Sequence, residues 1–201
     1  TMRTFHTGGI AGADITMGLP RVEELYEARI PKNAAPLSEL AGKVTITETE
    51  MGVKVRVRTT TKPYEEREYM IPISATLLVE DGQLISAGTQ LASGHLDIKE
   101  IVRVRGLKAA QRYIVDEVRK VYASQGVPIN EKHFETIVRK MSDKVRVESQ
   151  GDTNLLPGET IDRIKFEEEN QRILAAGGDP ATALVAVLGI TRASLLTESF
   201  L

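Results

Sequence analysis

Alternating apolar and polar positions mark residues 41–92 as a β region. The clearest stretch alternates valine with a basic residue: Val53-Lys54-Val55-Arg56-Val57-Arg58. A period of two places the valines on one face of a strand and the basic side chains on the other. The same alternation at 44–47 and 69–73 predicts further strands, and the pair Asp81-Gly82 predicts a tight turn.

A helical period replaces this alternation between residues 96 and 142. One apolar stripe follows i, i+3, i+4 spacing: Leu107, Ala110, Ile114, Val118, Val121 and Tyr122. We expect this helix to end at Gly126, and Asn130 to cap a next helix that extends to Met141. An earlier short helix is predicted between Pro20, which suits a first helical turn, and Pro31, which ends the pattern.

The last fifty residues mix both periods. Residues 145–147 indicate a short strand, and a helix is predicted from Glu159 to Ala176. Thr191 is expected to cap a final helix that is still running at Leu201, so the chain is expected to be cut at both ends. The pattern as a whole predicts an α+β fold, with residues 1–32, 33–95, 96–148 and 149–201 as its successive regions.

Composition narrows the function classes. Lys and Arg number 26 and Asp and Glu number 28, so the net charge of −2 excludes a uniformly basic nucleic-acid binder. The absence of cysteine excludes disulfides, thiolate zinc sites and cysteine nucleophiles. His95 and His133 have no ligand partner at i+3 or i+4, so no metal site is predicted. The longest apolar run, 183–190, is less than half of the roughly 20 residues that span a membrane.

The N-terminus contains the side chains best suited to binding a ligand or to catalysis. On a helix, Met2 and His6 share a face and Arg3 lies beside them. A thioether against a base, with a guanidinium and an imidazole toward phosphate oxygens, suits a nucleotide. Glycines at 8, 9 and 12 would let such a helix fold over a ligand and unfold again. The alternative is a frayed terminus with an incidental histidine.

The basic row of Lys54, Arg56 and Arg58 also has two interpretations. No acidic residue lies between Met51 and Tyr64, and such a row can bind nucleic-acid phosphates. Basic side chains also protect the edge strands of sheets from unwanted pairing. The sequence pattern leaves both interpretations open.

A glycine pair farther along the β region indicates a fold rather than a site. The segment from Val79 to Leu91, with Gly82 and Gly88, resembles the half-motif of biotinyl- and lipoyl-type barrel-sandwich domains. Such carriers need a lysine exposed at a hairpin tip. Met51-Gly52-Val53-Lys54 is the nearest stretch and matches that pattern poorly. We therefore expect barrel-sandwich-like strands, and a carrier domain remains an alternative function.

Several longer stretches carry a family resemblance. The chain opens with Thr1-Met2-Arg3-Thr4-Phe5-His6-Thr7-Gly8-Gly9. Next comes Asp14-Ile15-Thr16-Met17-Gly18-Leu19-Pro20-Arg21-Val22-Glu23-Glu24-Leu25-Tyr26-Glu27-Ala28-Arg29. Further stretches are Arg105-Gly106-Leu107, Gln125-Gly126-Val127 and Leu188-Gly189-Ile190-Thr191-Arg192-Ala193-Ser194. In this order they resemble the β′ subunit of the bacterial multi-subunit RNA polymerase, from its trigger loop through its jaw.

This resemblance implies roles for individual residues. Met2 would pack against the base of the incoming nucleoside triphosphate as a substrate-binding residue. Arg3 and His6 would reach its phosphates as catalytic residues when the trigger loop folds. The β region would be the jaw beside downstream DNA, with Lys54, Arg56 and Arg58 as DNA-binding candidates.

The resemblance also implies a setting. The chain would be a fragment of a nucleotidyltransferase subunit that works with the β, α, ω and σ subunits, downstream DNA and the nucleoside triphosphate, away from membranes. Magnesium would serve the intact polymerase through aspartates that are not on this chain, so the isolated fragment would be inactive. The expected location is the bacterial cytoplasm or a plastid. A stand-alone nucleic-acid-binding module is the other alternative function.

Overall fold

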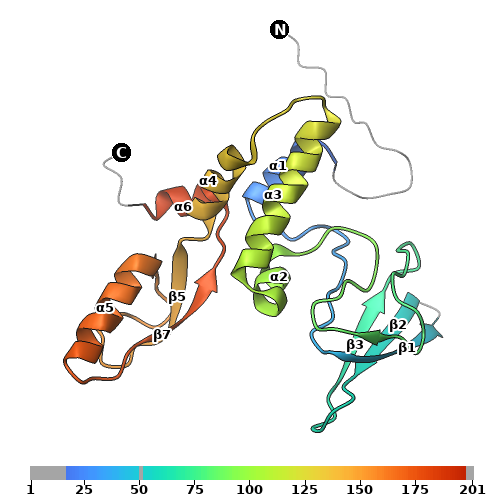
Figure 1. The fold of residues 1–201 in the computed structure, drawn as a ribbon, viewed down its shortest axis with the longest axis horizontal. Coiled ribbons are helices and arrows are strands. Elements are labelled where there is room, and N and C mark those ends of the chain that lie inside the picture. Colours follow the sequence, from blue (N-terminus) through green and yellow to red (C-terminus); the bar gives the residue numbers. More distant parts are fainter. Residues whose placement is uncertain (1–16, 50–51, 198–201) are drawn as a thin grey trace.

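A helical core lies between two antiparallel sheets in the computed structural model, which describes residues 17–49 and 52–197 (Figure 1). The helices of this core are α1 (Leu19–Tyr26), α2 (Ile98–Arg105), α3 (Leu107–Ser124) and α4 (Glu131–Met141). Pro20 lies in the first turn of α1, as predicted. The mixture of helices with antiparallel sheets confirms the predicted α+β class.

The predicted apolar stripe of α3 forms the centre of the helical core. Ala110, Ile114 and Val118 are fully buried, and Tyr122 stacks on Phe134 of α4 with ring centroids 5.5 Å apart. Helix α1 packs against the same helix although more than 80 residues separate them in sequence (Figure 1). The segment that follows the N-terminal glycines is therefore held by the core.

Capping groups set the boundaries of these helices. The Asn130 side chain accepts a hydrogen bond from the Lys132 amide at 3.1 Å, which confirms the predicted cap of α4. Asp97 caps α2 in the same way through the Lys99 amide at 2.9 Å. Gly106, with φ of 87°, ends α2 and begins α3, because only glycine adopts this conformation without strain.

The first sheet has the strand order β3-β2-β1-β4. Its strands are β1 (Gly42–Thr49), β2 (Gly52–Arg58), β3 (Glu66–Ile71) and β4 (Leu84–Ile85). Val55 and Val57 are buried in its core while Arg56 and Arg58 are exposed, so the predicted alternation is confirmed. The predicted turn is present at Asp81-Gly82, where Gly82 has a φ of 79°.

The second sheet has the order β6-β5-β7 and carries helix α5. Its elements are β5 (Lys144–Ser149), β6 (Thr160–Asp162), α5 (Arg163–Ala175) and β7 (Thr182–Ala186). The prediction of a helix from Glu159 was wrong at its start, because residues 160–162 pair with β5 and the helix begins at Arg163. Backbone pairing with a distant strand outweighs the local helical spacing there.

The last element, α6 (Ile190–Leu195), corrects two predictions. Gly189, not Thr191, is the N-cap, and the Thr191 hydroxyl instead donates a hydrogen bond to the Glu27 carboxylate just after α1. The helix ends at Leu195 rather than continuing, and residues 198–201 lie outside the described ranges. The buried Lys144 ammonium contacts Asp162 at 2.5 Å and the Leu196 carbonyl at 3.2 Å, which ties α6 to the second sheet.

Candidate functional site

The sequence-predicted site residues fall in two places. Met2, Arg3 and His6 lie outside the described residues, which begin at Met17. Lys54 and Arg56, together with Arg58, lie on β2. The structure shows that α1 is attached to a buried polar cluster.

Arg21 of α1 is the first member of this cluster. It is only 2% exposed, and its guanidinium forms an ion pair with the Glu24 carboxylate one turn later. A second guanidinium nitrogen donates to the Tyr113 hydroxyl of α3 at 3.2 Å. A buried arginine costs several kcal/mol in solvation unless it is paired, so these contacts are what permit its position.

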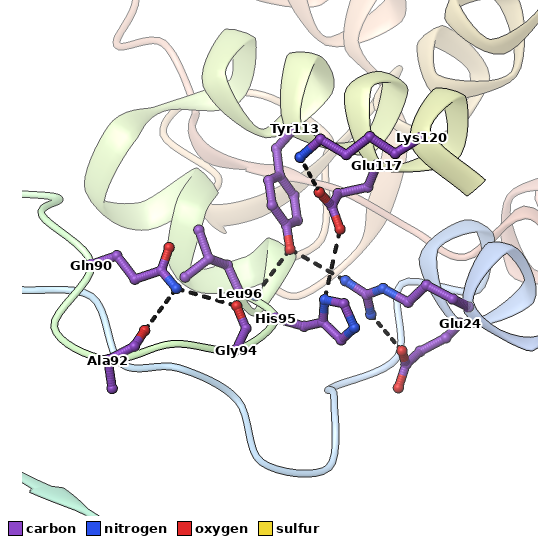
Figure 2. Close-up of polar contacts among 10 residues, drawn as sticks. Glu24, Gln90, Ala92, Gly94, His95, Leu96, Tyr113, Glu117 and Lys120 are labelled. Carbon is purple, nitrogen blue, oxygen red and sulfur yellow. Dashed lines mark hydrogen bonds and ion pairs between the residues drawn. The ribbon is translucent and has the colours of Figure 1, made fainter. Parts of the chain in front are cut away.

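Tyr113 connects α1 to the segment that leads from the first sheet to α2. Its hydroxyl also accepts a hydrogen bond from the Leu96 amide at 3.0 Å (Figure 2). Burial raises the pKa of Tyr113 above its ordinary value, although the hydrogen bonds from Leu96 and Arg21 oppose that shift. The neutral hydroxyl therefore accepts from two segments that are far apart in sequence.

Glu117, one turn farther along α3, extends the cluster toward solvent. Its carboxylate lies 3.7 Å from Nδ1 of His95 and accepts from the Lys120 ammonium at 2.8 Å (Figure 2). The carboxylate raises the pKa of Lys120. Gln90 folds the same connecting segment by donating to the Ala92 carbonyl at 2.7 Å. This polar cluster joins α1, α3 and the connection from the first sheet.

The basic row on β2 faces acidic partners from the neighbouring strand. Lys54 pairs with Glu68 at 2.6 Å, and Arg56 pairs with Glu66 at 2.6 Å and Glu68 at 2.8 Å. Hydrogen bonds from Lys54 and Arg56 lower the pKa of Glu68. The acids of β3 therefore share the charge of two basic residues, a pairing that depends on strand register and that local sequence did not reveal.

Arg58 differs from the other two members of the row. Its guanidinium carbon lies 5.4 Å from the centre of the exposed Tyr64 ring, a cation–π contact. No carboxylate within the described ranges forms an ion pair with it. Arg58 therefore presents the least compensated charge of the row.

The placement of Lys54 bears on the carrier alternative. This lysine lies within β2 and its ammonium is paired with Glu68, whereas a carrier lysine must be free at a hairpin tip. The geometry therefore does not favour a carrier domain.

Residues 17–49 and 52–197 contain no group of three or more His, Asp or Glu side chains placed to hold a metal ion. Among the helices described, none combines the length and apolarity needed to cross a bilayer.

Comparison with known proteins covers the whole chain. A family model described as RNA polymerase Rpb1, domain 5, matches residues 1–198. All 201 residues align, at 54% identity, with the DNA-directed RNA polymerase subunit beta' of Thermobifida fusca. The corresponding subunits of Acidothermus cellulolyticus and Acetivibrio thermocellus are 53% and 52% identical over the same length.

These relatives are much longer than the chain. It covers 16%, 15% and 17% of their respective lengths. A match of this identity over every residue leaves no part of the chain outside the alignment. The chain belongs to the family of DNA-directed RNA polymerase β′ subunits.

Proposed function

We propose that this chain is the part of an RNA polymerase β′ subunit that closes over the incoming nucleoside triphosphate and flanks downstream DNA. The alignment with β′ subunits over all 201 residues, including the stretch from Thr1 to Gly9, carries this proposal. The other polymerase subunits are its expected partners.

In this function, residues 1–16 act on the nucleotide. Met2 packs against the base, and Arg3 and His6 approach the phosphates, where an imidazole can donate a hydrogen bond or a proton. A segment that folds and unfolds over a substrate positions its side chains well only from a fixed base. The buried contacts of Arg21 with Glu24 and Tyr113 fix α1, so that α1 can serve as this base.

A kinetic experiment on His6 tests this role. In the assembled polymerase, His6→Ala should slow single-turnover nucleotide addition by about tenfold or more, the scale of a lost acid–base or phosphate contact. Affinity for the template should change by less than about twofold, because His6 acts on the nucleotide. His133→Ala, at an exposed position of α4, is the matched control and should leave the rate unchanged. An unchanged rate in His6→Ala would contradict the proposed role.

The first sheet is proposed to lie beside downstream DNA. Phosphate contacts by Lys and Arg supply sequence-independent, salt-dependent affinity. Because Glu66 and Glu68 already share the charges of Lys54 and Arg56, we assign the largest contribution to Arg58.

A further inference from the structure

A cavity of about 340 Å³ lies between α2 and the second sheet, apart from the buried polar cluster and from the basic row of β2. Its charged lining residues are all cationic: Lys99 of α2, Arg146 of β5 and Arg192 of α6. Among the residues that the structure describes, no aspartate or glutamate lines it. Three cations from three elements around one hollow favour an anionic ligand.

These three cations are uncompensated. Within the described residues, none of the side chains of Lys99, Arg146 and Arg192 forms an ion pair or a hydrogen bond. Elsewhere on the second sheet and its helix, Lys144 pairs with Asp162 and Arg172 pairs with Glu169. Cations that converge without carboxylates leave their donors available to a ligand.

The remaining walls are mostly apolar. Val187 and Leu188 are buried just after β7, and Val102 lies partly buried on α2. The Thr160 hydroxyl also lines the cavity and forms no hydrogen bond with any described residue. The Arg146 guanidinium lies beside Gly158. One of its terminal nitrogens is 4.0 Å from the position that a Cβ on residue 158 would occupy. Cationic and hydroxyl donors around an apolar wall suit a phosphate attached to an apolar or aromatic group.

We propose that this cavity binds a small organic phosphate of nucleotide size. Its volume is at the lower end of the range of about 300–1,000 Å³ for small-molecule pockets, which suits one nucleotide and not a stretch of duplex. Arg146 and Arg192 would hold the phosphate oxygens, with Lys99 as a further charge. The apolar wall, which includes Val102 and Val187, would contact the organic group.

Binding of a fluorescent nucleoside 5′-diphosphate to the assembled polymerase tests this proposal. Because the diphosphate can also enter the nucleotide-addition site, the readout is the difference between wild type and variants. Arg146→Gln and Lys99→Gln change exposed residues on separate elements, so a folding defect in one does not remove the test. Each should weaken binding by about tenfold, the expected loss for one charge-assisted contact. Arg172→Gln, an exposed cation of α5 paired with Glu169, is the matched control and should bind like wild type.

Two results would overturn the proposal. The first is equal affinity for the diphosphate in wild type, Arg146→Gln and Lys99→Gln. The second is that both variants lose affinity for a 5′-phosphorylated single-stranded DNA oligonucleotide but bind the diphosphate as the wild type does. That result would assign these cations to a nucleic-acid backbone instead of a small molecule.

Discussion

Arg21 is the residue whose pairing matters most to the helical core. Replacing it with methionine leaves the buried Glu24 carboxylate without its cation, so we expect Arg21→Met to lower the free energy of unfolding by about 3 kcal/mol or more. Arg29→Met breaks an exposed pair with Glu23 and should cost less than about 1 kcal/mol. Urea unfolding of the chain, monitored by circular dichroism, measures both.

A double variant separates the pair from the packing. Nε of Arg21 is buried without a hydrogen-bond partner in the described residues, so the native pair is itself imperfectly satisfied. Arg21→Met combined with Glu24→Leu removes both charges and should recover most of the lost stability. If the double variant is as unstable as Arg21→Met alone, the unpaired Glu24 carboxylate is not the cause.

Tyr26 gives the core a specific response to alkaline pH. Burial, with a further contribution from Tyr122, raises the pKa of Tyr26 from 10.0 to about 12. Between these values the folded state retains a proton that the unfolded state loses, so stability should fall as the pH rises from 10 to 12. Because the hydroxyl is buried without a partner among the described residues, Tyr26→Phe should cost little at pH 8.

Urea titrations at pH 8, 10 and 11 check this expectation. Tyr26→Phe should lose less stability than wild type above pH 10, since its side chain has no proton to release. Tyr64→Phe, at an exposed tyrosine, is the control and should follow the wild-type curve. Parallel curves for wild type and Tyr26→Phe would show that Tyr26 ionisation is not coupled to folding.

The burial of apolar residues was predicted from the sequence better than the burial of polar ones. The stripe on α3 follows from helical spacing alone, and Ala110, Ile114 and Val118 are buried as expected. The burial of Arg21 was not predictable in this way, because its partner Tyr113 lies 92 residues away. Local patterns give no signal for a contact that depends on tertiary packing.

Among the elements, β2 and β3 together determine how the first sheet would meet DNA. If the sheet flanks DNA as proposed, Arg58→Gln should reduce the slope of log affinity against log salt by about 1 for downstream DNA. Lys54→Gln should reduce it less, because Lys54 is already paired with Glu68. DNA binding by the assembled polymerase, measured over a salt series, compares the two variants.

A variant that neutralises the whole basic row gives the largest expected change in salt dependence. Neutralising Lys54, Arg56 and Arg58 together should lower the salt dependence at least as far as Arg58→Gln alone. Because β2 lies between β1 and β3, the row does not protect an edge strand. Unaltered slopes in all of these variants would mean that the row is only a solvated face of the sheet.

The elements themselves were predicted where local signals agree with tertiary structure. The cap at Asn130 and the alternation on β2 were both found. The segment at Thr160–Asp162 has helical spacing but pairs with β5, and the N-cap of α6 is Gly189. A Cβ at Gly189 would lie 2.5 Å from the Glu27 carbonyl oxygen, so glycine is required by a contact with the C-cap residue of α1 that no local pattern contains.

For the whole molecule, the polar cluster is where the separate parts meet. The hydroxyl of Tyr113 contacts α1 through Arg21 and the connection from the first sheet through Leu96 (Figure 2). Helix α1 and the connection from the first sheet are thus attached to one helical core. We propose that this core fixes α1 as the base from which the N-terminal segment would act on the nucleotide.

A double-mutant cycle on the rate of single-turnover nucleotide addition measures this coupling between α1 and His6. In the assembled polymerase, Arg21→Met should slow addition by about fivefold or more, because a displaced α1 misplaces His6. In a His6→Ala background the same change should slow it by less than about twofold, since the two residues act through one segment. If Arg21→Met slows addition by the same factor with His6 present and with His6→Ala, α1 does not act on the nucleotide through the N-terminal segment.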